Sequence, residues 1–64
     1  MSFADKFKEA RKAAHMSQQQ VADKLGLDRS AISHYENGDS QPTFKNISKI
    51  CEILNIPVEE IIEK

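Results

Sequence analysis

The chain has 64 residues, of which 39% are hydrophobic and 30% are charged. A chain of this length buries about 60% of the surface that its unfolded form exposes, so it supports one small core and a single domain over residues 1–64. The apolar content is too high for a disordered segment, and no apolar run is long enough to span a membrane. The opening MSFADKFKEARK lacks the apolar stretch of a signal peptide. We therefore expect an unprocessed, soluble, cytoplasmic protein.

Cysteine content and charge restrict the function further. The chain has one Cys and no CxxC or Cys/His cluster, so neither a disulfide framework nor a metal site is predicted. The formal net charge is -1, but residues 1–34 carry a net +2 and residues 35–64 a net -3. This polarity is compatible with a cationic face and an acidic end that is turned away from it.

Apolar spacing and helix caps predict two helices in the first half of the chain. Ser2 caps the first, which runs to about His15. Its apolar stripe consists of Phe3, Phe7, Ala10 and Ala14. Ser17 and Gln20 form a capping box that starts a second helix, and Gly26 ends it.

Three further short helices are expected. Asp28 caps a helix over residues 29–37, which ends at Gly38. Thr43 caps the next helix, and its apolar face comprises Phe44, Ile47, Ile50, Cys51 and Leu54. Pro57 suits the first turn of a fifth helix, whose apolar residues are Val58, Ile61 and Ile62. Because no segment alternates with period two for the length of a strand, the predicted fold is an all-α bundle of five helices.

The connection between the second and third helices carries the strongest signal. It consists of Gly26, Leu27 and Asp28, which is too short for an antiparallel hairpin and typical of a helix-turn-helix. Small Ala22 lies where the two helices would touch, and Ile32 lies where the third helix returns to the core. The segment SQQQVADKLGLDRSAISHYENG, residues 17–38, resembles the helix-turn-helix family of phage lambda repressor and Cro. The resemblance covers about residues 3–62 and implies a lambda-repressor-like fold whose 29–37 helix enters the DNA major groove.

The predicted third helix has an apolar and a polar face. At 100° per residue, Ile32 and Tyr35 point one way and a polar face without bulky aliphatic residues points the other. Such a face is most often merely solvated, but Arg can bond both acceptors of guanine, and Ser or His can bond base edges. The resemblance implies the following base-reading residues: Arg29, Ser30 and His34, with Asp28 and Ser33 beside them.

Phosphate contacts are expected around the same helix. The start of the second helix offers free backbone N–H groups, and the resemblance implies that Gln18 bonds phosphate and supports a base-reading side chain. The complete predicted phosphate-binding set is Ser17, Gln18, Asn37, Thr43, Lys45 and Asn46. The loop GDSQPT contains Asp39 and no Lys or Arg, which predicts fewer phosphate contacts and weaker non-specific affinity.

Two further sets of residues are interpreted as structural. Arg11 falls on the apolar face of the first helix and needs a partner, and the resemblance implies an ion pair with Glu36. The short fifth helix carries more apolar surface than one core face needs, which predicts a homodimer interface. Its expected residues are Val58, Ile62 and Ile53, although Val58 could equally complete the core of the monomer.

These patterns favour a sequence-specific DNA-binding regulator and not an enzyme. Cys51 is interpreted as a core residue and the acidic residues of the last helix as solvated, so no catalytic group, cofactor, metal or small-molecule ligand is expected. The preferred interpretation is a repressor that binds a palindromic operator as a homodimer. The alternatives are an antitoxin, the N-terminal domain of a longer repressor, or a protein-binding module on the same fold, which the acidic balance favours.

Overall fold

The computed structural model describes residues 2–61, and within this range it contains five helices and no strand. The helices are α1 (Phe3–Ala13), α2 (Gln18–Leu25), α3 (Arg29–Asn37), α4 (Phe44–Leu54) and α5 (Val58–Ile61). The predicted all-α architecture is confirmed.

Local side-chain and backbone chemistry explains where the helices begin and end. Ser17 Oγ accepts a hydrogen bond from the Gln20 backbone N–H at 3.0 Å, and the Gln20 side chain accepts one from the Ser17 N–H at 2.8 Å. This is the complete capping box. At the other end of α2 and of α3, Gly26 and Gly38 adopt φ of 71° and 80°, the left-handed conformation that often terminates a helix and that glycine adopts without steric cost.

The end of α1 differs from the prediction. The helix stops at Ala13 rather than near His15, because His15 has a φ of 58° and turns the chain. The backbone N–H of Met16 then donates to the carbonyl of Arg11 at 3.2 Å, which closes the helix end. His15 is therefore a left-handed end residue, a conformation that histidine tolerates better than most side chains.

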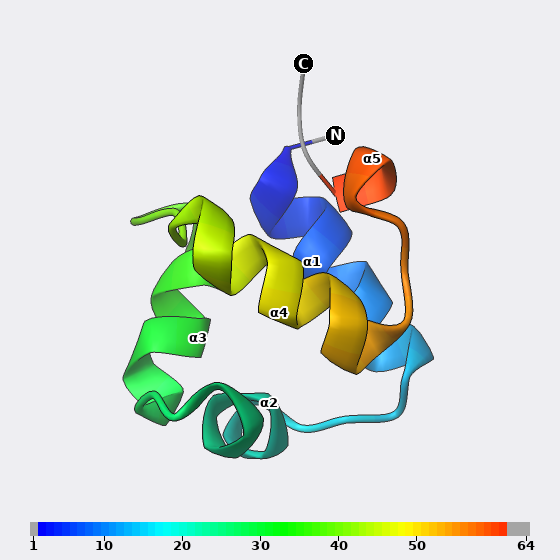
Figure 1. The fold of residues 1–64 in the computed structure, drawn as a ribbon. Coiled ribbons are helices and arrows are strands. Elements are labelled where there is room, and N and C mark those ends of the chain that lie inside the picture. Colours follow the sequence, from blue (N-terminus) through cyan, green and yellow to red (C-terminus); the bar gives the residue numbers. More distant parts are fainter. Residues whose placement is uncertain (1, 62–64) are drawn as a thin grey trace.

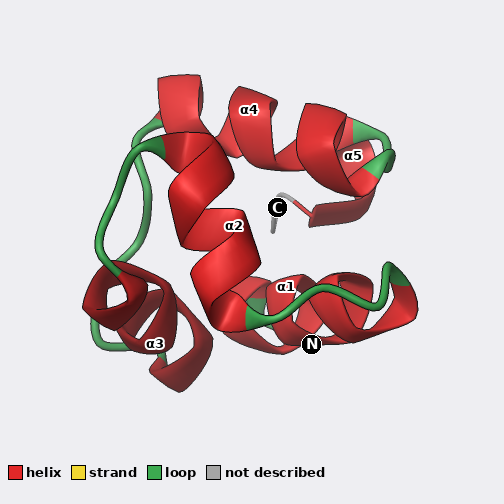
Figure 2. Cartoon of the chain, turned by 90° about the horizontal axis from the view of Figure 1, so that it is seen from below, coloured by secondary structure: helices red, strands yellow, loops and turns green. Residues whose placement is uncertain are grey.

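The helices surround one small core. Figure 1 shows α4 in front of α1, and Figure 2 shows α2 crossing between these two helices. Helix α2 packs against α3 and α4, while α5 packs against α1 and α4 and closes the opposite end. Helix α3 lies at the margin of the molecule in both views, packed against α1 and α2 on one side only.

The core contains most of the predicted apolar residues. Its fully buried members include Phe7, Val21, Ile32, Ile50 and Ile61. The Phe7 ring stacks with Phe3 and lies tilted against Tyr35, so α1 and α3 share an aromatic contact.

Phe44 does not join this core, contrary to the prediction. Its side chain is 67% exposed, although it lies at helical spacing from Ile47 and Cys51. Phe44 is the first residue of α4, and the core contacts of this helix begin one turn later. The apolar spacing was therefore correct for the helix but wrong for its first residue.

Candidate nucleic-acid interface

Helix α3 presents two chemically different faces. Ile32, Tyr35 and Glu36 are buried against the rest of the bundle. Arg29 and Ser30 are exposed in the first turn, and His34 is exposed one turn later. The second face of α3 is therefore largely open to solvent, from Arg29 in its first turn to Asn37 at its end.

The other two predicted base-reading residues, Ser33 and Asp28, differ in exposure from each other. Ser33 is half-buried at the edge of the polar face. Asp28 is exposed and is the N-cap residue by backbone position, but its side chain makes no capping hydrogen bond. The sequence therefore predicts the position of the cap correctly, but Asp28 does not form the expected side-chain hydrogen bond.

The N-terminus of α2 lies beside α3, because Gln18 in the first turn of α2 bonds to Glu36 of α3. Ser17 is exposed at this end, and its hydroxyl is engaged with Gln20. Gln18 is half-buried, and its Nε2 donates to Glu36 Oε1 of α3 at 3.1 Å. One amide hydrogen of Gln18 is thus committed to the protein, and the second is left for another acceptor.

The structure brings Arg11 and Glu36 together beneath this surface. Arg11 Nε donates to Glu36 Oε2 and Arg11 Nη2 donates to Glu36 Oε1 at 3.2 Å, a two-bond contact between α1 and α3. Arg11 Nη1 also donates to the carbonyl of Met16 at 2.7 Å. The Arg11 side chain is 12% exposed and that of Glu36 only 3%, so neither charge is left to water. Together with Gln18, the pair joins α1, α2 and α3.

The other predicted phosphate ligands lie around the loop after α3. Asn37 is the last residue of α3 and is exposed, and Lys45 is exposed in the first turn of α4. Thr43 Oγ1 accepts from the backbone N–H of Asn46 at 3.3 Å and caps α4, while Asn46 itself is half-buried. These four residues therefore come from two helix ends that flank a single loop.

A contact in this loop was not expected from the sequence. His34 Nδ1 lies 3.3 Å from Asp39 Oδ2, and both side chains are exposed. Asp39 had been interpreted only as a negative charge near the phosphates. The missed signal is the glycine between them, because a left-handed Gly38 turns residue 39 back toward the last turn of α3.

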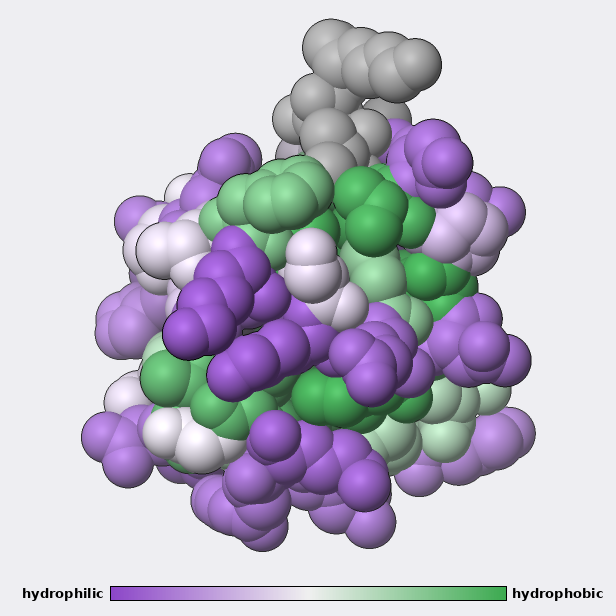
Figure 3. Space-filling view, viewed as in Figure 1, coloured by the Kyte–Doolittle hydropathy of each residue, from purple (hydrophilic) through white to green (hydrophobic). Residues whose placement is uncertain are grey.

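Two of the three predicted dimer residues lie within the described chain. Ile53 and Val58 are half-buried, and both pack partly against the core. Ile62 lies outside the described residues. Figure 3 shows apolar side chains reaching the surface on this side of the molecule, over α4 and α5, between hydrophilic ones.

Other chemistry is sparse in residues 2–61. This range contains no group of three or more His, Cys, Asp or Glu side chains that could hold a metal, and none of its helices is long and apolar enough to cross a membrane. Cys51 is buried in α4, and burial, with a smaller contribution from the charge of Glu59, raises the pKa of its thiol. Its position in the core agrees with the structural role expected of it.

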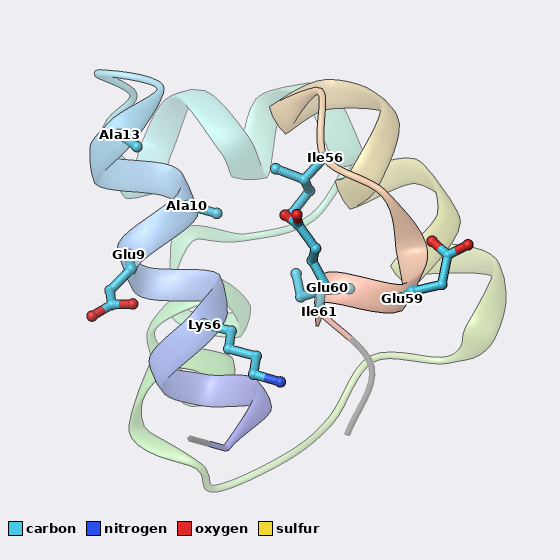
Figure 4. Close-up of a pocket in the computed structure, with 8 residues that line it drawn as sticks. All are labelled: Lys6, Glu9, Ala10, Ala13, Ile56, Glu59, Glu60 and Ile61. Carbon is cyan, nitrogen blue, oxygen red and sulfur yellow. The ribbon is translucent and has the colours of Figure 1, made fainter. Parts of the chain in front are cut away.

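A groove lies away from α3, between α1 and the segment around α5. Figure 4 shows Ala10 of α1 facing Ile56 across this groove, with Lys6 and Glu60 reaching over it. Since α5 and α3 occupy opposite margins of Figure 1, the groove is separate from the polar face of α3.

The comparisons agree with this architecture. A family model described as helix-turn-helix matches residues 7–61. Over 61 residues the chain is 34% identical to YqaE, an uncharacterized HTH-type transcriptional regulator of Bacillus subtilis, in an alignment that covers 95% of this chain and 53% of that protein. It is 33% identical to the cryptic phage CTXphi transcriptional repressor RstR of Vibrio cholerae, with 95% of this chain and 54% of that protein covered. The chain thus spans about half the length of these curated relatives.

A solved structure is similar over nearly its whole length. The crystal structure of the restriction-modification controller protein C.AhdI from Aeromonas hydrophila matches with a TM-score of 0.85 and 33% identity, covering 94% of this chain and 91% of that one. Since the family model extends from α1 to the end of α5, the protein belongs to the Cro/C1-type helix-turn-helix family.

Proposed function

We propose that this protein binds double-stranded DNA in a sequence-specific manner, with α3 in the major groove. The observation that carries the proposal is the open face of α3, where Arg29, Ser30 and His34 are exposed next to the N-terminus of α2. A groove of B-DNA admits one α-helix, and a helix-turn-helix supplies it with a second helix that crosses the phosphates.

Each part of this surface has a distinct task in the proposal. Arg29 projects from the first turn of α3, where its planar guanidinium can donate two bonds to the O6 and N7 acceptors of guanine. Gln18 uses its free amide hydrogen, together with the backbone N–H groups at the start of α2, to bind a phosphate. Further phosphates along the same strand are bound by the residues around the loop after α3, namely Asn37, Thr43, Lys45 and Asn46.

The proposed role of this binding is regulation of transcription, chiefly repression by occupancy of an operator. RstR is named as a repressor and YqaE as a regulator, and C.AhdI is titled a controller protein. The proposal involves no catalysis, and it places the protein in the cytoplasm, where bacterial and phage operators are found.

We further propose that two copies bind a palindromic operator through a surface that includes Ile53 and Val58, the two predicted interface residues within the described chain. Half-buried apolar side chains on α4 and α5 support this assignment. A two-fold dimer presents two α3 helices to successive major grooves, which requires half-sites about 34 Å apart along the duplex. Sedimentation of the protein with and without operator tests this stoichiometry, and a single protomer per site at saturation would contradict it.

Salt dependence tests the DNA binding itself. Neutralising phosphates releases counterions, so affinity for duplex DNA should fall at least about tenfold between 50 and 200 mM salt. Arg29→Ala should lower the affinity at every salt concentration, whereas the matched control Lys6→Ala, on the groove between α1 and α5, should change it little. Salt-independent binding, or equal losses in the two variants, would favour a protein-binding module with a net charge of -1 instead.

A further inference from the structure

His34 and Asp39 are connected twice, once by side chains and once by the backbone. The Asp39 carboxylate lies 3.3 Å from His34 Nδ1. The backbone N–H of Asp39 also donates to the carbonyl of His34 at 3.0 Å. The second bond follows from the left-handed Gly38, which returns the chain to the last turn of α3. The backbone therefore holds residue 39 where its side chain can reach the ring.

We propose that Asp39 is a positioning residue that determines which base edge His34 reads, an inference that rests on the proposed binding of DNA by α3. A carboxylate only accepts hydrogen bonds, so a contact with Asp39 requires the proton of the neutral ring to be on Nδ1. Nε2 then carries the lone pair. It is the nitrogen left for a partner outside the protein.

The tautomer decides the base preference. With its lone pair on Nε2, neutral His34 accepts a hydrogen bond, and the major-groove donors are the N6 amino group of adenine and the N4 amino group of cytosine. A protonated ring donates at Nε2 instead and suits the O6 and N7 acceptors of guanine. With Asp39 holding the proton on Nδ1, neutral His34 thus favours an amino-bearing base over guanine.

The surroundings of His34 leave Asp39 as its charged partner. Among residues 2–61, Asp39 is the one acidic residue with a carboxylate oxygen within 4.0 Å of a His34 ring nitrogen. On α3 itself, Glu36 is bonded by Arg11 of α1, and on α2 the carboxylate of Asp23 accepts from Gln19 at 2.8 Å. Arg29 lies five residues earlier on α3, more than one turn away.

This role also accounts for an acid at a position that faces the phosphates. A free carboxylate there would repel DNA and weaken binding to every sequence alike. When it is bonded to His34, the same carboxylate lowers the affinity for all DNA but fixes Nε2 of the ring as a hydrogen-bond acceptor. Such specificity is a difference in affinity between DNA sequences and not a higher affinity for all of them.

The test compares Asp39→Ala with the matched control Asp23→Ala, which removes one exposed negative charge from the neighbouring helix. Both variants and the wild type are titrated at pH 8.0 against the preferred duplex and its single-base variants. For the wild type, we expect a preference for adenine or cytosine at one base pair per half-site. Asp39→Ala should lose about threefold to tenfold of the discrimination at that base pair, while Asp23→Ala should only raise affinity evenly.

Two outcomes overturn the inference, and they are distinguishable from a failure of the proposed function. If Asp39→Ala and Asp23→Ala change all affinities equally, with no altered base preference, Asp39 does not position His34. If the wild type shows no sequence preference at all, the proposed function itself is wrong. Nitrogen NMR of the His34 ring in the free protein provides an independent check, since the Nδ1–H tautomer should predominate in the wild type at pH 8.0 and decline in Asp39→Ala.

Discussion

Replacing Arg11 by Met tests the buried ion pair, because Met preserves much of the side-chain volume and removes the charge. Glu36 would keep its bond from Gln18 but lose both guanidinium donors, in a site where its side chain is 3% exposed. The Met16 carbonyl would also lose its donor. An uncompensated carboxylate at such a position is costly in free energy of unfolding.

The magnitude follows from the burial of the pair. Breaking a buried ion pair from one side costs about 3 to 5 kcal/mol, because the remaining charge is uncompensated. Together with the lost bond to Met16, we expect Arg11→Met to lower the free energy of unfolding by about 3 to 5 kcal/mol. For a domain of this size, a loss of that order removes much of the stability.

Chemical denaturation of the single variants Arg11→Met and Glu36→Gln and of the double variant measures the coupling. We expect the double variant to be much more stable than the sum of the single losses predicts. The control Lys12→Met, at an exposed neighbour, should change stability by less than about 0.5 kcal/mol. Additive losses in the single and double variants would refute the argument.

Three further predictions concern base readout, the turn and the core. Arg29→Ala should cost about 1 to 3 kcal/mol of binding free energy and relax the preference at one base pair per half-site. Gln18→Ala should instead weaken binding to all single-base operator variants evenly. A loss in Arg29→Ala that is equal for every operator variant would make Arg29 a phosphate contact. Gly26→Ala should cost about 1 to 2 kcal/mol in thermal denaturation, since an added Cβ meets nothing within 4 Å and only the left-handed backbone resists it, and an unchanged stability would contradict this. Cys51 should react slowly with a thiol reagent at pH 8, because burial and the charge of Glu59 raise its pKa and keep the thiol protonated, and unfolding in denaturant should restore the rate; fast reaction of the folded protein would mean that α4 opens readily.

Local signals in the sequence were sufficient for the helices and the turn. The capping box at Ser17 and the glycines at positions 26 and 38 act over three or four residues, so their outcome depends little on the rest of the fold. The same locality explains the error at Phe44. Helical spacing places it on the apolar face, but only the tertiary arrangement shows that the core does not extend to the first residue of α4.

Contacts across the fold could be anticipated only through family resemblance, or not at all. The pair of Arg11 and Glu36 lies 25 residues apart in sequence, and no periodicity links its members. The bond from Gln18 to Glu36 and the contact between His34 and Asp39 depend on side-chain conformations that neither spacing nor composition defines. The candidate DNA-reading face of α3 could be predicted only in part. The sequence indicates which residues share the face, but the packing of the helices determines that the face is exposed.

Selection of binding sites from random duplex DNA is the measurement that tests the central claim most directly, namely that the exposed face of α3 reads base sequence. At moderate salt, the wild-type protein should enrich a palindromic motif whose two half-sites are centred about 10 base pairs apart. Arg29→Ala should retain the spacing and lose the preference at one base pair of each half-site. Recovery of random sequences without an enriched motif, or an identical motif with Arg29→Ala, would contradict the account.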